Sequence, residues 1–150
     1  NMVRLGIGLY GVSNDLKEQK YLETVGTLKS VISQVRVIDA GESVGYGRKF
    51  VAKRITKVAT IPIGYADGIS RGLGNGVGYI NIKDQKAKIL GNVCMDMIMV
   101  DVTDIECTEG ESVIVFGEKP SVSSIAKKLN TIPYEILTSI SQRVKRVFYR

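Results

Sequence analysis

Hydrophobic and polar residues alternate along most of the chain, which is the two-residue period of a β-strand with one buried face. The alternating runs, rich in β-branched residues, are VGTLKSVISQVRVID, FVAKRITKVATIPIG, VGYINIK, AKILGNVCMDMIMVDV and SVIVFG. Segments rich in Gly, Asp and Asn, such as AGESVGYG and KDQK, separate the runs and predict turns. The pattern therefore predicts a mainly β fold, a small antiparallel β-barrel-like domain.

Helical signals gather near the end of the chain. Ser121 or Ser123 can cap a helix over SIAKKLN, and Pro133 fits the first turn of a second helix, PYEILTSI. The closing SQRVKRVFYR alternates again and predicts a last strand. We therefore expect one or two short helices close to the C-terminus.

The first ten residues differ from the rest, because NMVRLGIGLY is apolar almost throughout. Such a run is typical of a strand buried on both faces in a parallel sheet. We therefore predict that residues 1–10 are the last strand of a preceding domain and that residues 11–150 form the β domain. Because the chain begins with Asn1 and not with Met, we also expect it to be part of something longer.

Three glycines in this segment, Gly6, Gly8 and Gly11, have the G-x-G-x-x-G spacing of a dinucleotide-binding loop. That loop also requires a strand before the first glycine, a helix after the last, and an acidic residue about 20 positions further on. Only five residues precede Gly6, and the apolar stripe after Gly11 is imperfect. The spacing by itself therefore favours a strand that contains glycines.

Composition and charge restrict the classes of function. A length of 150 residues suits one domain with a core, and 44% hydrophobic with 24% charged residues is ordinary for a globular chain. The chain has no histidine, and Cys94 and Cys107 lack C-x-x-C spacing. A zinc site, a Cys-His pair and a Ser-His-Asp triad are thereby excluded within the chain. We predict no bound metal, no membrane span and a cytoplasmic location.

The net charge of +6 permits a nucleic-acid partner. A basic β-barrel of this size could bind single strands as an OB-like module, with Tyr79, Phe148 and Tyr149 as stacking surfaces. The basic residues are scattered, however, except in RVKRVFYR, and such a face is more often a solvated strand. Nucleic-acid binding therefore stands as an alternative, as does a domain that serves only for assembly, and the leading prediction has no nucleic-acid partner.

Five segments of the chain are informative when taken together and in this order: VRLGIGLYG, ESVGYG, TIPIGYADG, GNVCMDM and IPYEILTSIS...RVKRVFY. Together they resemble the C-terminal part of alanine racemase, the pyridoxal phosphate enzyme that interconverts L- and D-alanine. The resemblance implies a missing N-terminal (β/α)8 barrel whose lysine binds the cofactor covalently, with residues 1–10 as its last strand. Without that lysine we expect the isolated chain to be inactive. A serine racemase of the same architecture is the alternative.

The resemblance also implies roles for single residues. Racemisation removes the Cα proton from one face and returns one to the other, so two acid/base groups flank the substrate. In the family the lysine serves one face, and a tyrosine from the second subunit of a head-to-tail dimer serves the other; Tyr46 matches that tyrosine. Arg4 matches the arginine that faces the pyridine nitrogen. Gly6 and Ile7 would bind the cofactor phosphate through backbone amides, and Tyr134 through its hydroxyl.

Further matches concern the substrate. Met95 and Asp96 match a loop near the substrate carboxylate, where Met95 acts through its backbone amide. From the residues alone, VCMDMIMV is more simply a core strand with methionines as gap fillers, in which Asp96 must find a donor. Tyr65 and Arg71 resemble residues of the substrate corridor. Asn92 departs from the family pattern, because many members have an arginine at this position.

Overall fold

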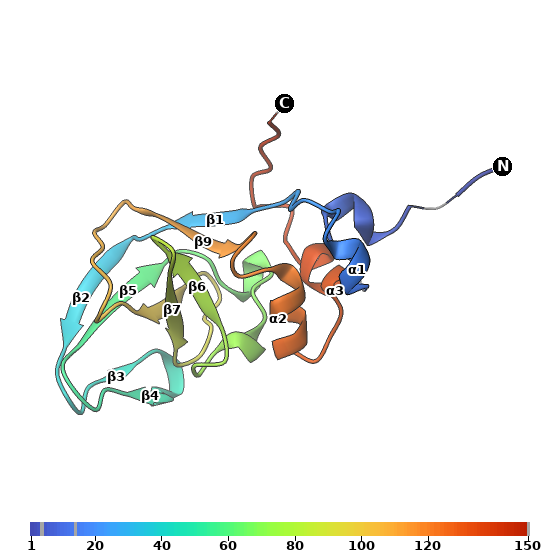
Figure 1. Cartoon of the computed structure of the whole chain (residues 1–150). Coiled ribbons are helices and arrows are strands. Elements are labelled where there is room, and N and C mark those ends of the chain that lie inside the picture. The colour runs from blue at the N-terminus through green and yellow to red at the C-terminus, as the bar shows by residue number, and fades with distance from the viewer. Residues whose placement is uncertain (4, 14, 150) are drawn as a thin grey trace.

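A curled antiparallel sheet forms the body of the molecule (Figure 1), in a computed structural model that describes residues 1–3, 5–13 and 15–149. Its strands are β1 (Leu28–Val31), β2 (Gln34–Ile38), β5 (Thr56–Ile61), β6 (Tyr79–Ile82), β7 (Gln85–Leu90), β8 (Ile98–Asp101) and β9 (Ser112–Phe116). They lie in the order β1-β9-β6-β7-β8-β5-β2. Two further short strands, β3 (Ser43–Val44) and β4 (Phe50–Val51), pair as a separate hairpin.

The sheet curls because β1 and β2 are consecutive in the chain but stand at opposite ends of the strand order. At the bend between them, the amide of Ile32 donates to the carbonyl of Glu111 (2.9 Å), beside β9. The next amide, that of Ser33, donates to the carbonyl of Thr60 in β5 (2.9 Å). One stretch of chain thus binds both ends of the sheet. The prediction of a mainly β, antiparallel and barrel-like domain is confirmed.

The alternating apolar residues of the strands point inward and form the core. Its fully buried members include Ile61, Ile80, Ile82, Ile89, Ile98, Val100 and Val113. A second, smaller cluster lies under the β3–β4 hairpin and consists of Ile38, Val44, Ala52, Val58, Leu90, Cys94 and Met99. Burial of apolar area is the main favourable contribution to folding, so the second cluster holds the hairpin against the sheet.

Two short helices follow the sheet, as predicted. Helix α2 (Val122–Lys128) begins after Ser121, whose Oγ accepts a hydrogen bond from the amide of Ser124 (3.2 Å). Helix α3 (Pro133–Thr138) begins with its proline, which needs no partner for an amide hydrogen. A third helix, α1 (Leu16–Gln19), lies close to the N-terminus. Within the described ranges, no helix is long and apolar enough to cross a membrane.

Both ends of the chain differ from the strands that the sequence predicts. Ile7–Tyr10 form a 3-10 helix, η1, and the described part of residues 1–10 contains no strand. The assignment of this segment to a barrel stays a prediction, because a parallel strand takes its hydrogen bonds from neighbouring strands. Residues 145–149 are also irregular, with Phe148 and Tyr149 89% and 91% exposed. The strand predicted there is wrong, since alternation alone supplies no pairing partner.

Candidate functional site

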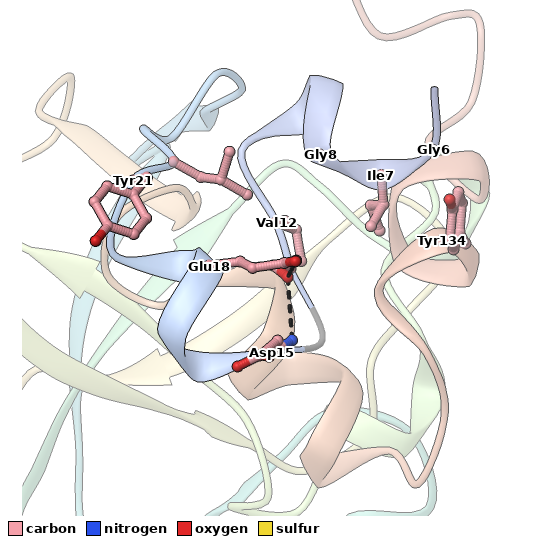
Figure 2. Close-up of a pocket in the computed structure, with 10 residues that line it drawn as sticks. Gly6, Ile7, Gly8, Val12, Asp15, Glu18, Tyr21 and Tyr134 are labelled. Carbon is pink, nitrogen blue, oxygen red and sulfur yellow. Dashed lines mark hydrogen bonds between the residues drawn. The ribbon is translucent and has the colours of Figure 1, made fainter. Parts of the chain in front are cut away.

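A hollow of about 640 Å³ lies between the N-terminal segment and α3 (Figure 2), and Gly6, Ile7 and Tyr134 line it. A Cβ atom at Gly6 would lie 2.7 Å from the Tyr134 hydroxyl oxygen, so the glycine permits this close approach. Three of the four residues predicted to bind the cofactor thus meet at one place from opposite ends of the chain. The fourth, Arg4, lies outside the described residues.

Gly6, Ile7 and Gly8, at the start of η1, line this hollow. The first hydrogen bond of η1 runs from the amide of Leu9 to the carbonyl of Gly6 (3.3 Å). The amides of Gly6, Ile7 and Gly8 come before it, and none of them donates a hydrogen bond to another residue that the structure describes. Backbone amides at the start of a helical turn are suited to an anion.

Two carboxylates, Asp15 and Glu18, also line the hollow. Asp15 accepts a hydrogen bond from the amide of Lys17 (2.7 Å), and Glu18 accepts one from the hydroxyl of Ser13 (2.9 Å). In Figure 2 both lie on the side away from Tyr134. Only the end of the hollow at Tyr134 is therefore suited to an anion.

Tyr46 stands at the tip of the β3–β4 hairpin, at the start of the short 3-10 turn η2 (Tyr46–Arg48). Gly45 and Gly47 on either side of it have φ angles of 73° and 70°, a region in which glycine carries no steric cost. The Tyr46 side chain is 78% exposed. Figure 1 shows this hairpin far from α1 and α3, so the structure does not bring Tyr46 to the hollow of its own chain.

The predicted substrate loop packs against the segment that carries Tyr65, which begins η3 (Tyr65–Asp67). The amide of Tyr65 donates to the carbonyl of Cys94 (2.9 Å), and the amide of Ala66 to that of Met95 (3.0 Å). A Cβ atom at Gly64 would lie 2.3 Å from both carbonyl oxygens. The structure therefore brings Tyr65 and Met95 together through backbone contacts.

The loop is also more open than a core strand. Met95 is 54% exposed, Asp96 and Met97 are exposed too, and β8 begins only at Ile98. The interpretation of VCMDMIMV as a continuous core strand is wrong for residues 95–97. Arg71, the other predicted corridor residue, is exposed at the start of η4 (Arg71–Leu73), on the same connection between β5 and β6 as Tyr65.

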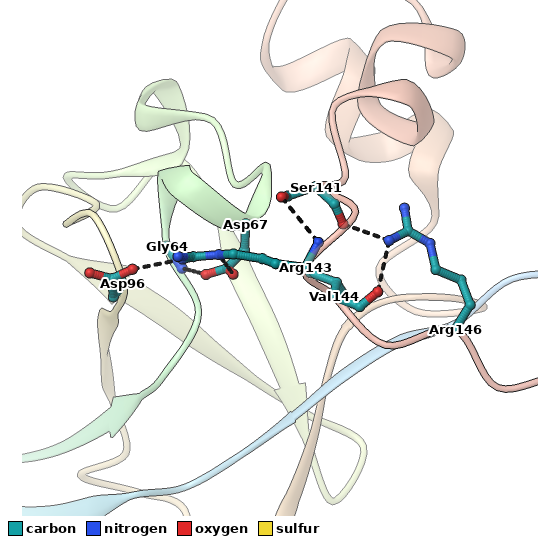
Figure 3. Close-up of polar contacts among 7 residues, drawn as sticks. All are labelled: Gly64, Asp67, Asp96, Ser141, Arg143, Val144 and Arg146. Carbon is teal, nitrogen blue, oxygen red and sulfur yellow. Dashed lines mark hydrogen bonds and ion pairs between the residues drawn. The ribbon is translucent and has the colours of Figure 1, made fainter.

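Arg143 joins these two loops and is the residue that sequence reasoning missed. Its Nε donates to Oδ1 of Asp67 and its Nη2 to Oδ1 of Asp96, both at 2.7 Å (Figure 3). Arg146 fixes the segment that presents Arg143, because its guanidinium donates to the carbonyl of Val144 (2.7 Å). Asp96 thus has a donor from a segment 47 residues further along the chain, although its exposed side chain does not require one.

Hydrogen bonds within the cluster of Asp67, Asp96 and Arg143 shift the pKa values of Asp67 and Arg143. Burial raises the pKa of Asp67, but hydrogen bonds from Arg143 and from the amide of Gly64 outweigh it, and the pKa lies below its usual value. The hydrogen bonds to Asp67 and Asp96 raise the pKa of Arg143 above its usual value. The ion pair of Arg143 with Asp67 consequently persists at neutral pH, and the two contacts of Arg143 join the C-terminal segment to both loops.

The residues of the nucleic-acid alternative do not share a face. The ring of Tyr79, on β6, lies under the ammonium groups of Lys86 and Lys128, 5.1 and 5.8 Å from its centroid. Phe148 and Tyr149 lie instead in the C-terminal segment that projects from the domain (Figure 1).

The described residues contain no group of three His, Cys, Asp or Glu side chains placed to hold a metal ion.

Comparison with known proteins gives a consistent result along the chain. The family model described as "Alanine racemase, C-terminal domain" matches residues 25–148. The alanine racemase of Helicobacter pylori (strain J99) is 44% identical over 99% of this chain and 41% of its own length. Alanine racemase 2 of Caldanaerobacter subterraneus subsp. tengcongensis is 42% identical over 99% of this chain and 40% of its own length.

Solved structures match the fold equally well. Alanine racemase from Bartonella henselae with covalently bound pyridoxal phosphate has a TM-score of 0.89 and 38% identity, over 96% of this chain and 40% of that one. Biosynthetic alanine racemase from Pseudomonas aeruginosa also has a TM-score of 0.89, with 34% identity over 97% of this chain and 41% of that one. The chain spans about two fifths of the length of these relatives. It belongs to the alanine racemase C-terminal domain family.

Proposed function

We propose that the chain is the C-terminal part of an alanine racemase that uses pyridoxal phosphate and acts in the cytoplasm. In this proposal it supplies one of two acid/base groups and part of the cofactor site. The observation that carries the proposal is the approach of Gly6 to the Tyr134 hydroxyl at a hollow that the start of η1 also lines. The lysine that binds the cofactor covalently belongs to a preceding barrel domain, so the chain alone is inactive.

The cofactor phosphate fits one end of the hollow. Backbone amides of Gly6 and Ile7, at the start of η1, would donate to it, and so would the Tyr134 hydroxyl. A side chain at Gly6 would fill the space beside that hydroxyl, whose oxygen would be only 2.7 Å from a Cβ atom. Arg4 would donate to the pyridine nitrogen and keep it unprotonated, because an arginine does not give up its proton.

Tyr46 would hold and transfer the proton at one face of the substrate Cα. Pyridoxal phosphate, when bound, withdraws electrons from Cα and acidifies its C–H bond. A phenol with a reference pKa near 10 needs positive charge or hydrogen-bond donors close by to act as a base at neutral pH. We infer that the site of a second copy provides these groups, because the Tyr46 turn lies far from the hollow of its own chain (Figure 1).

The remaining predicted residues would bind and admit the substrate. Met95 and Asp96 would belong to a loop near the carboxylate of L- or D-alanine, where the Met95 amide would donate to that carboxylate and Arg143 holds Asp96. Tyr65 and Arg71 would line the corridor, and Tyr134 would crowd the substrate side chain. Discrimination between alanine and serine would then rest on that contact, since one hydroxyl can be accepted or rejected by a single group.

The experiment combines this chain with the preceding barrel domain of the same protein and pyridoxal phosphate. We expect D-alanine to form from L-alanine only in the mixture, together with an absorbance band of covalently bound cofactor. Racemisation by the chain alone would contradict the proposal, as would a loaded mixture that leaves alanine unchanged. A parallel assay with serine separates the two substrates, and faster turnover of serine would replace alanine in the proposal.

A further inference from the structure

We propose that Asn92 is a positioning residue for Tyr46, and that its side-chain amide holds the turn from which the tyrosine projects. Asn92 Nδ2 donates a hydrogen bond to the backbone carbonyl of Tyr46 at 2.9 Å. The contact joins two segments 46 residues apart, the hairpin tip and the loop that carries Met95. The effect of this hydrogen bond on catalysis rests on the proposed function of Tyr46. The hydrogen bond itself is observed independently of that proposal.

The turn needs an external support. Strands β3 and β4 contribute only two residue pairs, Ser43 with Val51 and Val44 with Phe50. Beyond them the backbone passes through positive φ angles at Gly45 and Gly47, and glycine is the residue with the most conformational freedom to lose. Tyr46 as a whole residue is 78% exposed, so packing within this chain contributes little to holding its side chain. The direction of the ring therefore depends on the backbone at Tyr46, which Asn92 fixes.

Asn92 is itself well placed to act as a support. Its Oδ1 accepts a hydrogen bond from Nδ2 of Asn75 (3.3 Å), so both ends of its carboxamide have a partner. The backbone amide of Asn75 donates to the carbonyl of Gly91 (2.7 Å). Val93, which follows Asn92 in the chain, is 1% exposed in the core. The turn is thus connected through Asn92 to the rigid part of the domain.

The carboxamide of Asn92 differs chemically from the arginine side chain that many family members have at this position. A carboxamide donates and accepts, whereas a guanidinium only donates. An arginine at position 92 would have no acceptor to offer Asn75, so the pair formed by Asn75 and Asn92 depends on the asparagine. Because a carboxamide carries no charge, this support of Tyr46 is also independent of pH.

The test replaces Asn92 by aspartate, which has the same shape and keeps the acceptor for Asn75 but cannot donate to Tyr46. Asn130→Asp is the matched control, because it makes the same chemical change at an exposed position after α2. The first readout is the NMR order parameter of the backbone over residues 45–48 in this chain. We expect values near 0.85 in the parent and the control, and a fall to below about 0.6 in Asn92→Asp.

The second readout is the kinetics of the mixture with the barrel domain. We expect kcat to fall between about tenfold and 100-fold in Asn92→Asp, with KM within about twofold, because a misplaced group slows chemistry more than binding. Unchanged order parameters at residues 45–48 would overturn the positioning role, and so would a mobile turn with an unchanged kcat. If the parent mixture does not racemise alanine, the proposed function fails while the order parameters still decide whether Asn92 holds the turn.

Discussion

Gly64 and Gly6 both allow candidate site residues to meet, but they approach different kinds of atom. A Cβ atom at Gly64 would lie 2.3 Å from the carbonyl oxygens of Cys94 and Met95, which belong to the backbone. A Cβ atom at Gly6 would lie 2.7 Å from the hydroxyl of Tyr134, which is the end of a side chain that is 43% exposed. The first contact cannot yield without moving a loop, whereas the second can yield when the whole Tyr134 side chain swings about its Cα–Cβ bond.

The difference separates the candidate site into a rigid part and an adjustable part. The loops of Tyr65 and Met95 are joined by backbone hydrogen bonds and by Arg143, so this domain alone sets their arrangement. The hollow at Tyr134 is closed by η1, a four-residue turn next to the N-terminus. We infer that a neighbouring domain completes the adjustable part, in agreement with the proposed barrel.

Gly64→Ala has the largest expected effect and tests the rigid part. Two backbone carbonyls would have to move, and we expect the free energy of unfolding to fall by about 3 kcal/mol or more. Urea denaturation of this chain measures it. Gly26→Ala is the control, since a Cβ atom there meets nothing within 4 Å. Equal stability of the two variants would show that the loops of Tyr65 and Met95 are not rigidly packed.

Arg143→Gln should have an intermediate effect, because it removes both ion pairs while leaving the backbone contacts of the loops. We expect a lower melting temperature at neutral pH and faster hydrogen exchange over residues 94–97. Arg36→Gln, at an exposed position of β2, is the control. A melting temperature and exchange rates equal to those of the parent would show that Arg143 does not tie the loops together.

The effect of Arg143→Gln should depend on pH in a defined direction. The pKa of Asp67 is lower in the folded protein than its usual value, so its ion pair stabilises the fold above that usual value. The contribution is lost as the pH falls through the folded pKa, where Asp67 becomes protonated. The difference in melting temperature between parent and variant should therefore shrink below about pH 4. A constant difference down to pH 2 would contradict this linkage.

Gly6→Ala has the smallest expected effect and tests the adjustable part. A swing of the Tyr134 side chain about its Cα–Cβ bond should relieve the contact, and we expect a loss of less than about 1 kcal/mol in the free energy of unfolding. Tyr134→Phe removes the hydroxyl, so Gly6→Ala should cost less in that background than in the parent. A loss as large as that of Gly64→Ala would show that the Gly6 approach is as rigid as the one at Gly64.

The sheet could be predicted from the sequence because apolar residues of the main core recur at every second position in several strands, although consecutive residues are buried in β5, β6 and β8. Ile80 and Ile82 in VGYINIK are buried as the pattern requires, and Ser121 caps α2 as expected. The two ends of the chain could not be predicted in the same way. In NMVRLGIGLY and SQRVKRVFYR, hydrophobic residues mark segments without a pairing partner in the described chain, and Phe148 is 89% exposed.

Candidate site residues that belong to a sequence motif could be predicted, whereas residues that join the site only through tertiary contacts could not. Tyr46, Met95 and Tyr134 follow from their motifs through the family resemblance. The apolar run around Asp96 predicts a donor for its carboxylate, but nothing local points to Arg143, because RVKR has the composition of an ordinary basic segment. In the sequence, Asn92 stands out only as a departure from the family pattern, and its hydrogen bond to the Tyr46 carbonyl depends on the fold.

The most direct test of the central claim, that Tyr46 serves one face of the substrate, uses Tyr46→Phe in the loaded mixture with the barrel domain in deuterium oxide. Loss of the hydroxyl should slow racemisation by a factor on the order of 10² to 10⁴, because general acid–base catalysis contributes about that much. The account predicts that the variant keeps its bound cofactor and exchanges the Cα proton of only one alanine enantiomer for deuterium. Exchange of both enantiomers at the parent rates, or retained racemisation, would contradict it.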